Sequence, residues 1–142
     1  MTKEEIVTAI NKHPVFYLAT TENNIPHVRG MLLYRATMDE LIFHTARCKE
    51  LPGQISKNNN VEMCFNADGV QIRINGKAEL MDNKSIKDEI AATPSRAFIK
   101  KWKDSVPAAT FYNEFLVYHV TKGKINLWTM DRNLEPKIEL EY

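Results

Sequence analysis

The chain has 142 residues, a length that fits one domain built around one hydrophobic core. Hydrophobic residues make up 44% and charged residues 26%, a composition typical of soluble globular proteins. With 19 basic and 18 acidic side chains the net charge is +1, which argues against a general electrostatic attraction to nucleic acid or to an anionic membrane surface.

A short helix over residues 3–12 is the first predicted element. Thr2 is typical of an N-cap, and Glu5 follows at the spacing of a capping box. Apolar residues recur at helical spacing along this stretch, at Ile6, Val7, Ala9 and Ile10. Pro14 then ends the helix, because proline lacks the N–H that a further turn needs.

Three strands are predicted after this helix, over residues 15–20, 27–35 and 41–45. Residues that favour strands are dense in all three. Residues 23–26 and 38–40 have the composition of turns. Because these connections are short, we expect the three strands to pair in sequence as an antiparallel meander.

One helix and two strands are predicted in the middle of the chain. Residues 48–57 are helix-like, and Pro52-Gly53 fits there only near the first turn, where a missing N–H breaks no helical hydrogen bond. Residues 61–65 are predicted as the next strand and Asp68-Gly69 as a tight turn. Residues 70–80 alternate between apolar and polar, which predicts a long strand with one buried face.

Two helices and a hairpin are predicted in the last third. The helices lie within residues 84–104 and are separated at Thr93-Pro94, with Ser95 as the N-cap of the second. Residues 115–121 and 124–130 are predicted to pair as a hairpin. The tail NLEPKIELEY ends in a predicted edge strand.

These elements together predict a mainly β fold in a single domain, residues 1–142: a closed or nearly closed β-barrel with peripheral helices. Strands rarely alternate with long helices, which argues against a doubly wound parallel sheet. No apolar run approaches the roughly 18 residues that span a bilayer, and no signal peptide opens the chain. We therefore expect a cytoplasmic protein in which Cys48 and Cys64 are reduced.

Chemically active side chains gather in residues 43–55, FHTARCKELPGQI. Cys48 lies next to Arg47 and Lys49, and neighbouring cations are typical of reactive thiols. A cysteine nucleophile, however, also needs a base that a third group orients, and the sequence shows no such partner for His44. We therefore favour an incidental cysteine over a catalytic one.

A metal site has little support in the sequence. The four histidines, His13, His27, His44 and His119, are scattered, and neither a C-x-x-C nor an H-x-x-x-H spacing occurs. We expect no metal, although ligands from distant parts of the chain would leave no local pattern.

An anion site explains more of these residues together. The strand that ends at Thr45 leads into a helix, and a helix N-terminus offers free N–H groups and the positive end of a dipole. Lys49 opposes that dipole unless an anion is bound. Arg29, on the preceding strand, would reach the same place across the meander and grip a phosphate at two points. The alternative is that Arg29, Arg47 and Lys49 are solvated surface charges.

The order and spacing of five short motifs resemble the pyridoxamine 5′-phosphate oxidase-like, FMN-binding split-barrel family. They are FYLAT in the first strand, P-x-V-R in the second, T-x-x-x-K after the third, N-x-x-V at the fourth and R-I-x-G-x-A-E in the fifth. The resemblance covers roughly residues 14–82, and the closing hairpin with Trp128 and NLEPK agrees with it. The small nitroimidazole-resistance or general-stress members look most similar.

The resemblance implies a split barrel with Greek-key antiparallel strands, and a homodimer with FMN at the subunit interface. Arg29, Thr45 and Lys49 match the family positions that hold the FMN phosphate. Arg47 and Gln54 are further candidates on the phosphate side.

The resemblance also implies where the flavin ring would lie. The backbone around Met31, Leu32 and Leu33 would run along the isoalloxazine, and Trp128 would help to cover the ring from the other subunit. His44 takes a place where some nitroimidazole-resistance relatives have a functional histidine, so it is the candidate catalytic residue.

Two positions depart from the family pattern. Gly30 stands where many relatives have proline after the arginine. Oxidases that act on pyridoxamine phosphate carry further basic residues near the C-terminus to bind the substrate phosphate, whereas Arg132 and Lys137 are the only cations in this chain's last segment. We therefore do not expect true pyridoxamine phosphate oxidase activity.

The resemblance thus implies an FMN-dependent oxidoreductase that reduces a small organic acceptor such as a nitroaromatic or a quinone, with the flavin supplying the chemistry. One alternative is a non-catalytic flavin- or haem-binding module on the same barrel, and another is a deazaflavin enzyme. A further alternative is an interaction barrel that uses the Lys100–Lys103 helix, in which Phe98 and Trp102 are expected to face the core. We expect neither nucleic acid nor a membrane as a partner.

Overall fold

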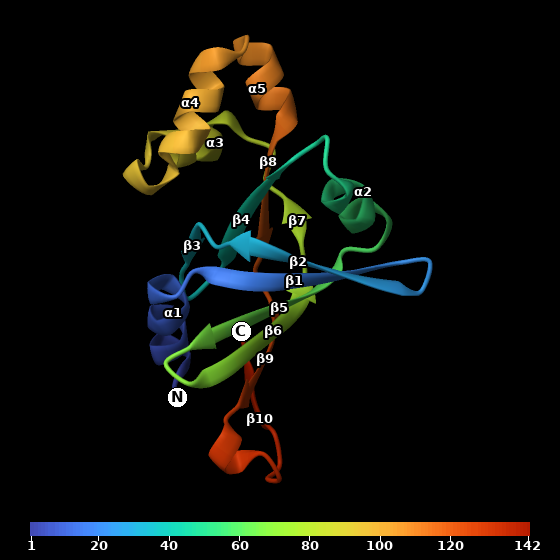
Figure 1. The fold of residues 1–142 in the computed structure, drawn as a ribbon, viewed down its shortest axis with the longest axis vertical. Coiled ribbons are helices and arrows are strands. Elements are labelled where there is room, and N and C mark those ends of the chain that lie inside the picture. The colour runs from blue at the N-terminus through green and yellow to red at the C-terminus, as the bar shows by residue number, and fades with distance from the viewer.

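Two antiparallel sheets with helices around them make up the structure, a computed structural model that describes residues 1–142 (Figure 1). The larger sheet has the strand order β10-β9-β6-β5-β1-β2, where the strands are β1 (Val15–Glu22), β2 (Ile25–Leu32), β5 (Asn60–Ala67), β6 (Val70–Lys77), β9 (Gly123–Trp128) and β10 (Ile138–Glu141). The smaller sheet has the order β3-β4-β8-β7, where the strands are β3 (Arg35–Ala36), β4 (Leu41–Ala46), β7 (Glu79–Leu80) and β8 (Phe115–Val120). Neither sheet closes on itself, so the predicted mainly β fold is confirmed as a split rather than a closed barrel.

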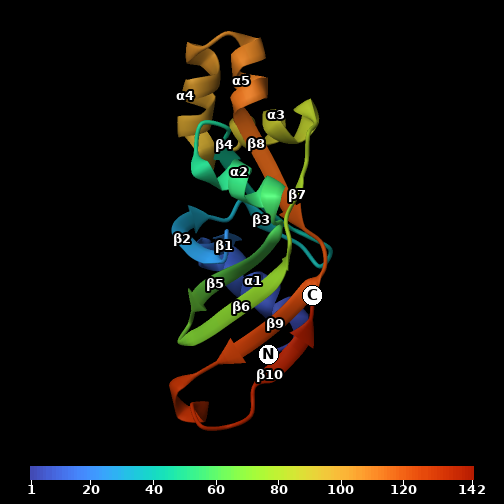
Figure 2. The same ribbon diagram turned by 90° about the vertical axis from the view of Figure 1, so that its right-hand side faces the viewer.

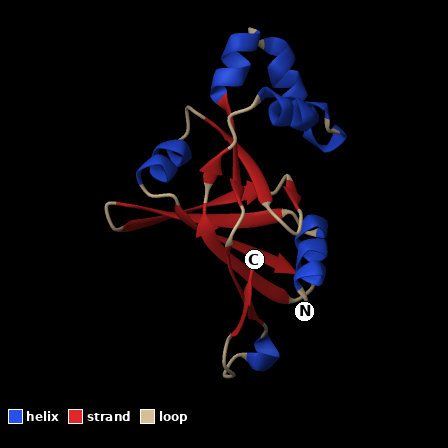
Figure 3. Ribbon diagram, turned by 180° about the vertical axis from the view of Figure 1, so that it is seen from behind, coloured by secondary structure: helices blue, strands red, loops and turns tan.

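The helices lie at the periphery of the sheets (Figure 3). They are α1 (Lys3–Lys12), α2 (Glu50–Lys57), α3 (Lys84–Ala92), α4 (Ala97–Ser105) and α5 (Ala108–Glu114), with short 3-10 turns η1 (Pro94–Arg96) and η2 (Met130–Arg132). We call residues 84–114, from α3 to α5, the helical cap. None of the helices combines the length and the apolar character that crossing a membrane requires.

Helix α1 begins where the sequence predicts it. The Glu5 N–H donates to Thr2 Oγ1 at 3.2 Å, and the Thr2 N–H donates to Glu5 Oε2 at 2.8 Å, which completes the capping box. Ile6, Ala9 and Ile10 are buried against the sheets, so the predicted helix and its apolar face are both confirmed.

The predicted three-strand meander is wrong. Strand β2 pairs with β1, but β4 pairs with β3 and β8 in the other sheet. The chain changes sheets at two residues: the Leu33 N–H donates to Pro14 O at 2.8 Å, and the Tyr34 N–H donates to Ile42 O at 2.9 Å. Residues 31–34 are all apolar, so the sequence does not mark this break and residues 27–35 resemble one uninterrupted strand.

The predicted hairpin near the C-terminus is wrong for the same reason. Strand β8 lies in the smaller sheet, whereas β9 pairs with β6 and β10 in the larger one. Residues 70–80 are likewise divided at Ala78 into β6 and β7, which belong to different sheets. Where the chain enters β9, a Cβ on Gly123 would lie 1.8 Å from the Asn75 carbonyl oxygen, so only glycine fits this backbone approach. The predicted edge strand of the tail is confirmed as β10.

Two hydrophobic clusters stabilise the fold. The larger, of 23 buried residues, fills the space between the sheets, α1 and α2. The smaller, of 8 buried residues, joins the helical cap to β4 and β8 through Ile42, Ile86, Ile90, Ala91, Ile99, Phe111, Phe115 and Val117. The cap is therefore packed onto the smaller sheet, and it projects at one end of the molecule, opposite β9 and β10 (Figures 1 and 2).

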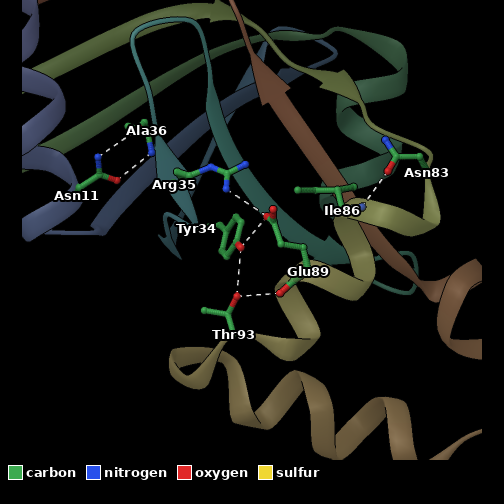
Figure 4. Close-up of polar contacts among 8 residues, drawn as sticks. All are labelled: Asn11, Tyr34, Arg35, Ala36, Asn83, Ile86, Glu89 and Thr93. Carbon is green, nitrogen blue, oxygen red and sulfur yellow. Dashed lines mark hydrogen bonds and ion pairs between the residues drawn. The ribbon is translucent and has the colours of Figure 1, made fainter.

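Polar contacts also attach the helical cap to Tyr34 and Arg35, where the chain passes from the larger sheet to the smaller one (Figure 4). Glu89 Oε2 accepts from Tyr34 Oη at 2.8 Å and from Arg35 Nη1 at 3.2 Å. Thr93 Oγ1 donates to the Glu89 carbonyl at 2.8 Å. Ser95 is not the N-cap that the sequence predicts, because η1 comes first and Arg96 occupies the N-cap position of α4.

Candidate functional site

A cleft of about 290 Å³ opens between strand β2, the end of β4 and helix α4. We call it the β2–α4 cleft. Its lining residues are Gly30, Met31, Leu32, His44, Thr45, Ala46, Lys49, Phe98, Ile99, Trp102 and Phe115. The structure therefore brings together five of the residues that the sequence singles out: Met31, Leu32, His44, Thr45 and Lys49.

The polar side of the cleft leads to the start of α2. Thr45 is buried at the end of β4, and Lys49 is the N-cap residue of α2. Lys49 makes no side-chain capping bond, so the first N–H groups of the helix have no side-chain acceptor. Glu50 is the one acidic residue in the first turn. A strand end, a hydroxyl, a cation and an uncapped helix start thus meet at one place, a donor set that suits an oxyanion.

Arg29 reaches this neighbourhood by a route that the sequence does not predict. Its Nη1 donates to Thr20 Oγ1 at 2.9 Å and to the Leu18 carbonyl at 3.3 Å, and its Nη2 donates to Gln54 Oε1. Thr20 Oγ1 also donates to Gln54 Oε1, at 2.6 Å. Burial lowers the pKa of Arg29, while the carboxylate of Glu50 raises it. Arg29 is therefore tied to the second turn of α2 through Gln54, and not to β4 by strand pairing.

Three of the candidate residues lie away from the cleft. Arg47 Nε donates to the Asn113 carbonyl at 2.9 Å and so holds the end of α5. The Leu33 side chain is buried in the main core. Trp128, on β9, donates from Nε1 to Asn133 Oδ1 at 3.0 Å and lines a separate hollow of about 320 Å³. Strand β9 lies towards the end of the molecule opposite the helical cap (Figures 1 and 2).

His44 accepts a hydrogen bond from Arg96, a residue that was not among the candidates predicted from the sequence. Arg96 Nε donates to His44 Nε2 at 3.1 Å, and Arg96 Nη2 donates to the Leu33 carbonyl at 2.8 Å. Burial, then the charges of Arg96 and Lys49, lower the pKa of His44 to about 4. His44 is therefore neutral near pH 7. No local pattern marks Arg96, since it lies 52 positions along the chain from the histidine that it contacts.

Aromatic side chains from the cap and β8 form the apolar wall of the cleft. The His44 ring centroid lies 5.3 Å from that of Phe115. Trp102 packs edge-on against Phe111 at 5.4 Å, so its predicted inward orientation is confirmed. Phe98 is 57% exposed, so its predicted place in the core is wrong, and it instead lies over the cleft. A flat apolar ligand would have aromatic contacts on this side.

The two cysteines show no arrangement for catalysis. Both are free thiols, with Cys48 exposed and Cys64 partly buried. Burial raises the pKa of Cys64, which disfavours a thiolate. His44 uses Nε2 to accept from Arg96, and no histidine forms a hydrogen bond to either thiol. No group of three or more His, Cys, Asp or Glu side chains is placed to hold a metal ion.

Comparison with known proteins places this geometry in a family. The model of the pyridoxamine 5′-phosphate oxidase family matches residues 2–126. A pyridoxine/pyridoxamine 5′-phosphate oxidase of Pelagibacter ubique is 28% identical over 98 residues, which cover 67% of this chain and 47% of that protein. The chain thus spans about half the length of this curated relative.

Solved structures share the fold along nearly the whole chain. A NimC/NimA family protein of Clostridium acetobutylicum superposes with a TM-score of 0.75 at 22% identity, covering 99% of this chain and 93% of that one. A pyridoxamine 5′-phosphate oxidase-related, FMN-binding protein of Nostoc punctiforme superposes with a TM-score of 0.67 at 17% identity, covering 98% and 89%. The matched residues include both strands that flank the cleft and the start of α2, and the chain belongs to the pyridoxamine 5′-phosphate oxidase family.

Proposed function

We propose that the protein binds FMN in the β2–α4 cleft and acts as an FMN-dependent oxidoreductase on a small organic acceptor, such as a nitroaromatic or a quinone. Family membership and the FMN-binding neighbour support a flavin-binding, oxidoreductase-type role in general. The observation that carries the proposal is the meeting of Thr45, Lys49 and the uncapped start of α2 beside the backbone of residues 30–32 in one cleft.

The phosphate of FMN would lie at the start of α2. Thr45 would offer its hydroxyl, Lys49 its ammonium group, and the first turn its free N–H groups. Arg29 supports this placement, because two of its five N–H donors, on Nε and Nη2, have no acceptor within the chain. A bound phosphate would also remove the unfavourable interaction between the Lys49 charge and the helix dipole.

The ring system of FMN would lie along β2, where Met31 and Leu32 line the cleft. FMN accepts hydride at its N5 and passes electrons on, and the protein supplies binding, orientation and electrostatics. The aromatic wall of Phe98, Trp102 and Phe115 would exclude water from the opposite side.

A second copy of the chain would complete the site. Three large apolar side chains on one face of the β1–β2 hairpin are exposed, namely Val15 at 60%, Tyr17 at 52% and Val28 at 69%. Such a patch is typical of a protein interface. It runs into the cleft, because Tyr17 pairs with Gly30 and Val15 with Leu32. The hairpin also projects from the body of the molecule, where a partner can reach it (Figure 1).

The size of the cleft agrees with a homodimer. Small-molecule sites usually measure about 300–1,000 Å³, and the cleft of one chain, about 290 Å³, is at the lower end. Trp128 lies far from the cleft of its own chain, so it would contribute to the flavin site of the other subunit. This arrangement makes FMN binding and dimer formation interdependent.

A flavin-binding module without turnover is the second candidate. His44 is neutral near pH 7, since its pKa is about 4, and no carboxylate lines the cleft. The cleft therefore offers neither a carboxylic acid nor an imidazolium to release a proton beside a reduced acceptor.

An absorbance spectrum of the purified protein and an FMN titration followed by melting temperature test the proposal. We expect flavin bands, or, for protein purified without cofactor, a melting temperature that rises with FMN. NADH or NADPH with a nitroaromatic then separates the two candidates, because only the oxidoreductase consumes the acceptor. A colourless protein whose melting temperature does not change on addition of FMN would contradict both the oxidoreductase and the flavin-binding module.

A further inference from the structure

Arg96 is a buried cation without a carboxylate partner. Its side chain is 4% exposed, and it forms no ion pair. Its hydrogen bonds go to the Leu33 carbonyl, to His44 Nε2, and to the carbonyl and hydroxyl of Ser95 at 3.5 and 3.3 Å. The guanidinium carbon also lies 5.8 Å from the centroid of the Tyr34 ring. Burying a charge among neutral groups is unfavourable, so a role for Arg96 beyond packing is indicated.

The contact with His44 fixes which imidazole nitrogen carries the proton. A guanidinium group only donates hydrogen bonds, so Nε2 of His44 must accept from Arg96. The single proton of the neutral ring then lies on Nδ1. Nδ1 makes no hydrogen bond within the chain, and it is not among the buried polar atoms without a partner, so it is accessible.

The groups that face His44 favour the neutral ring. Arg96 approaches from η1, Lys49 from the start of α2, Phe115 from β8 and Phe98 from α4. No carboxylate faces the ring from any of these elements. A second proton would have to lie beside the Arg96 guanidinium. Burial lowers the pKa of His44 most, and the charges of Arg96 and Lys49 lower it further.

We propose that Arg96 is a positioning residue: it holds His44 as a neutral imidazole with the proton on Nδ1, so that the β2–α4 cleft presents a fixed N–H donor to an acceptor atom of a bound molecule. The ligand class follows from the surroundings. Phe98, Trp102 and Phe115 suit a flat aromatic ring. Two cations without a carboxylate favour a neutral or anionic molecule whose oxygen, of the nitro or carbonyl type, accepts from Nδ1.

The ligand part of this inference rests on the proposed function of the cleft, whereas the state of His44 does not. Nuclear magnetic resonance of the protein labelled with ¹⁵N in its histidines reports both the protonation state of His44 and the binding of a ligand beside it. The measurement can be made with or without FMN. The His44 signals are assigned as those that disappear in His44→Asn. We expect the ¹⁵N shifts of an Nδ1–H tautomer, and no protonation of His44 until the pH falls below about 5.

Variants of Arg96 test its role. In Arg96→Met, Nε2 loses its donor, so we expect the proton to distribute over both nitrogens. We also expect the pKa of His44 to rise above about 4 but to stay below its ordinary value, because burial and Lys49 still lower it. Arg96→Lys keeps a charged donor and should retain the Nδ1–H state. Arg35→Met is the matched control. Arg35 also connects the start of β3 to the helical cap, through Glu89, but it does not contact His44. The His44 signals should therefore not change in this variant.

The tautomer and the pKa of His44 in the unmodified protein test the role of Arg96 even if Arg96→Met does not fold. A proton on Nε2, or titration near pH 6.5, overturns the role of Arg96. Unchanged His44 signals in a folded Arg96→Met protein overturn it as well.

Two probes of the same shape test the ligand class on the same samples. We expect 4-nitrobenzyl alcohol to shift the His44 Nδ1 resonance, and the cation 4-nitrobenzylamine to need a concentration at least about tenfold higher, because like charges repel. Equal potency of the two probes overturns the ligand class. If FMN does not bind but the tautomer is as expected, the proposed function fails while the assignment to Arg96 stands.

Discussion

Arg29 of β2 donates a hydrogen bond to the side-chain oxygen of Gln54 in α2, and Thr20 of β1 donates to the same oxygen at 2.6 Å. One amide group thus joins two adjacent strands to the helix whose N-terminus faces the cleft. Thr20 and Gln54 are both buried. The position of α2, and with it Lys49, depends on this buried polar network.

Gln54→Leu should therefore destabilise the protein and weaken FMN binding together. Leucine leaves the Thr20 hydroxyl and an Arg29 N–H without their acceptor, and a buried unsatisfied group costs about 1–3 kcal/mol. Urea denaturation measures the loss of unfolding free energy. Gln71→Leu, at a half-buried position of β6 that makes no side-chain hydrogen bond, is the control and should change stability by about 0.5 kcal/mol or less. Equal effects of the two substitutions would show that the hydrogen-bond network of Arg29, Thr20 and Gln54 does not contribute to the free energy of unfolding.

Arg29→Ala and Lys49→Ala should each weaken FMN binding while the fold is retained. Hydrogen bonds to a charged group contribute about 1.5–3 kcal/mol, which corresponds to a dissociation constant roughly 10- to 150-fold higher. Fluorescence titration of FMN into the refilled apoprotein measures this change. Lys122→Ala removes an exposed lysine remote from the cleft and should leave the affinity unchanged. Normal affinity in both site variants would place the phosphate elsewhere.

Burial of neutral His44 should make the protein less stable in mild acid. The folded-state pKa, about 4, is below the ordinary value of 6.5, so the unfolded chain binds a proton more readily than the folded one. The contribution to stability is complete above pH 6.5 and is lost as the pH falls from there to about 4. The loss amounts to about 3 kcal/mol. Chemical denaturation at several pH values measures it, and His44→Asn should remove this part of the slope. Parallel pH profiles of the two proteins would contradict the assignment.

Val28→Glu should separate the proposed dimer and release FMN at the same time. The exposed apolar patch of the β1–β2 hairpin would acquire a charge that a second copy would have to bury, which costs several kcal/mol. Sedimentation velocity reports the oligomeric state, and the flavin absorbance of the sedimenting species reports the cofactor. Lys101→Glu, an exposed position of α4, is the control for a change of charge. A monomer that still binds FMN tightly would exclude an interface site.

The sequence predicts those features that depend on neighbouring residues. The capping box of α1, the turn at Asp68-Gly69 and the junction from Thr45 to Lys49 are each set by a few adjacent positions, and all three are present in the structure. Whether the junction binds a phosphate stays a prediction, because geometry alone does not test it.

Features that depend on distant pairing could not be predicted. Leu33 and Tyr34 continue the apolar pattern of β2, yet their N–H groups bond to different sheets. Which strand receives them is decided by pairing with residues far along the chain. The same holds for Arg96, whose role appears only when the cap places it behind His44. Arg29 contacts α2 through Gln54, so the pairing with β4 that was assumed for it is wrong, and its role at a phosphate stays a prediction.

The crossing of the chain from β8 into β9 gives the last prediction. A Cβ on Gly123 would lie 1.8 Å from the Asn75 carbonyl oxygen, and this neighbour is backbone that the paired strands hold in place. Gly123→Ala should therefore cost about 3 kcal/mol or more, or prevent folding, because β6 and β9 must separate. Gly53→Ala is the matched control: nothing lies within 4 Å of its Cβ position in α2, so alanine should stabilise the protein by about 0.5–1 kcal/mol. Denaturation midpoints measure both. If Gly123→Ala is tolerated as well as Gly53→Ala, strands β6 and β9 do not approach each other at Gly123 as closely as their register requires.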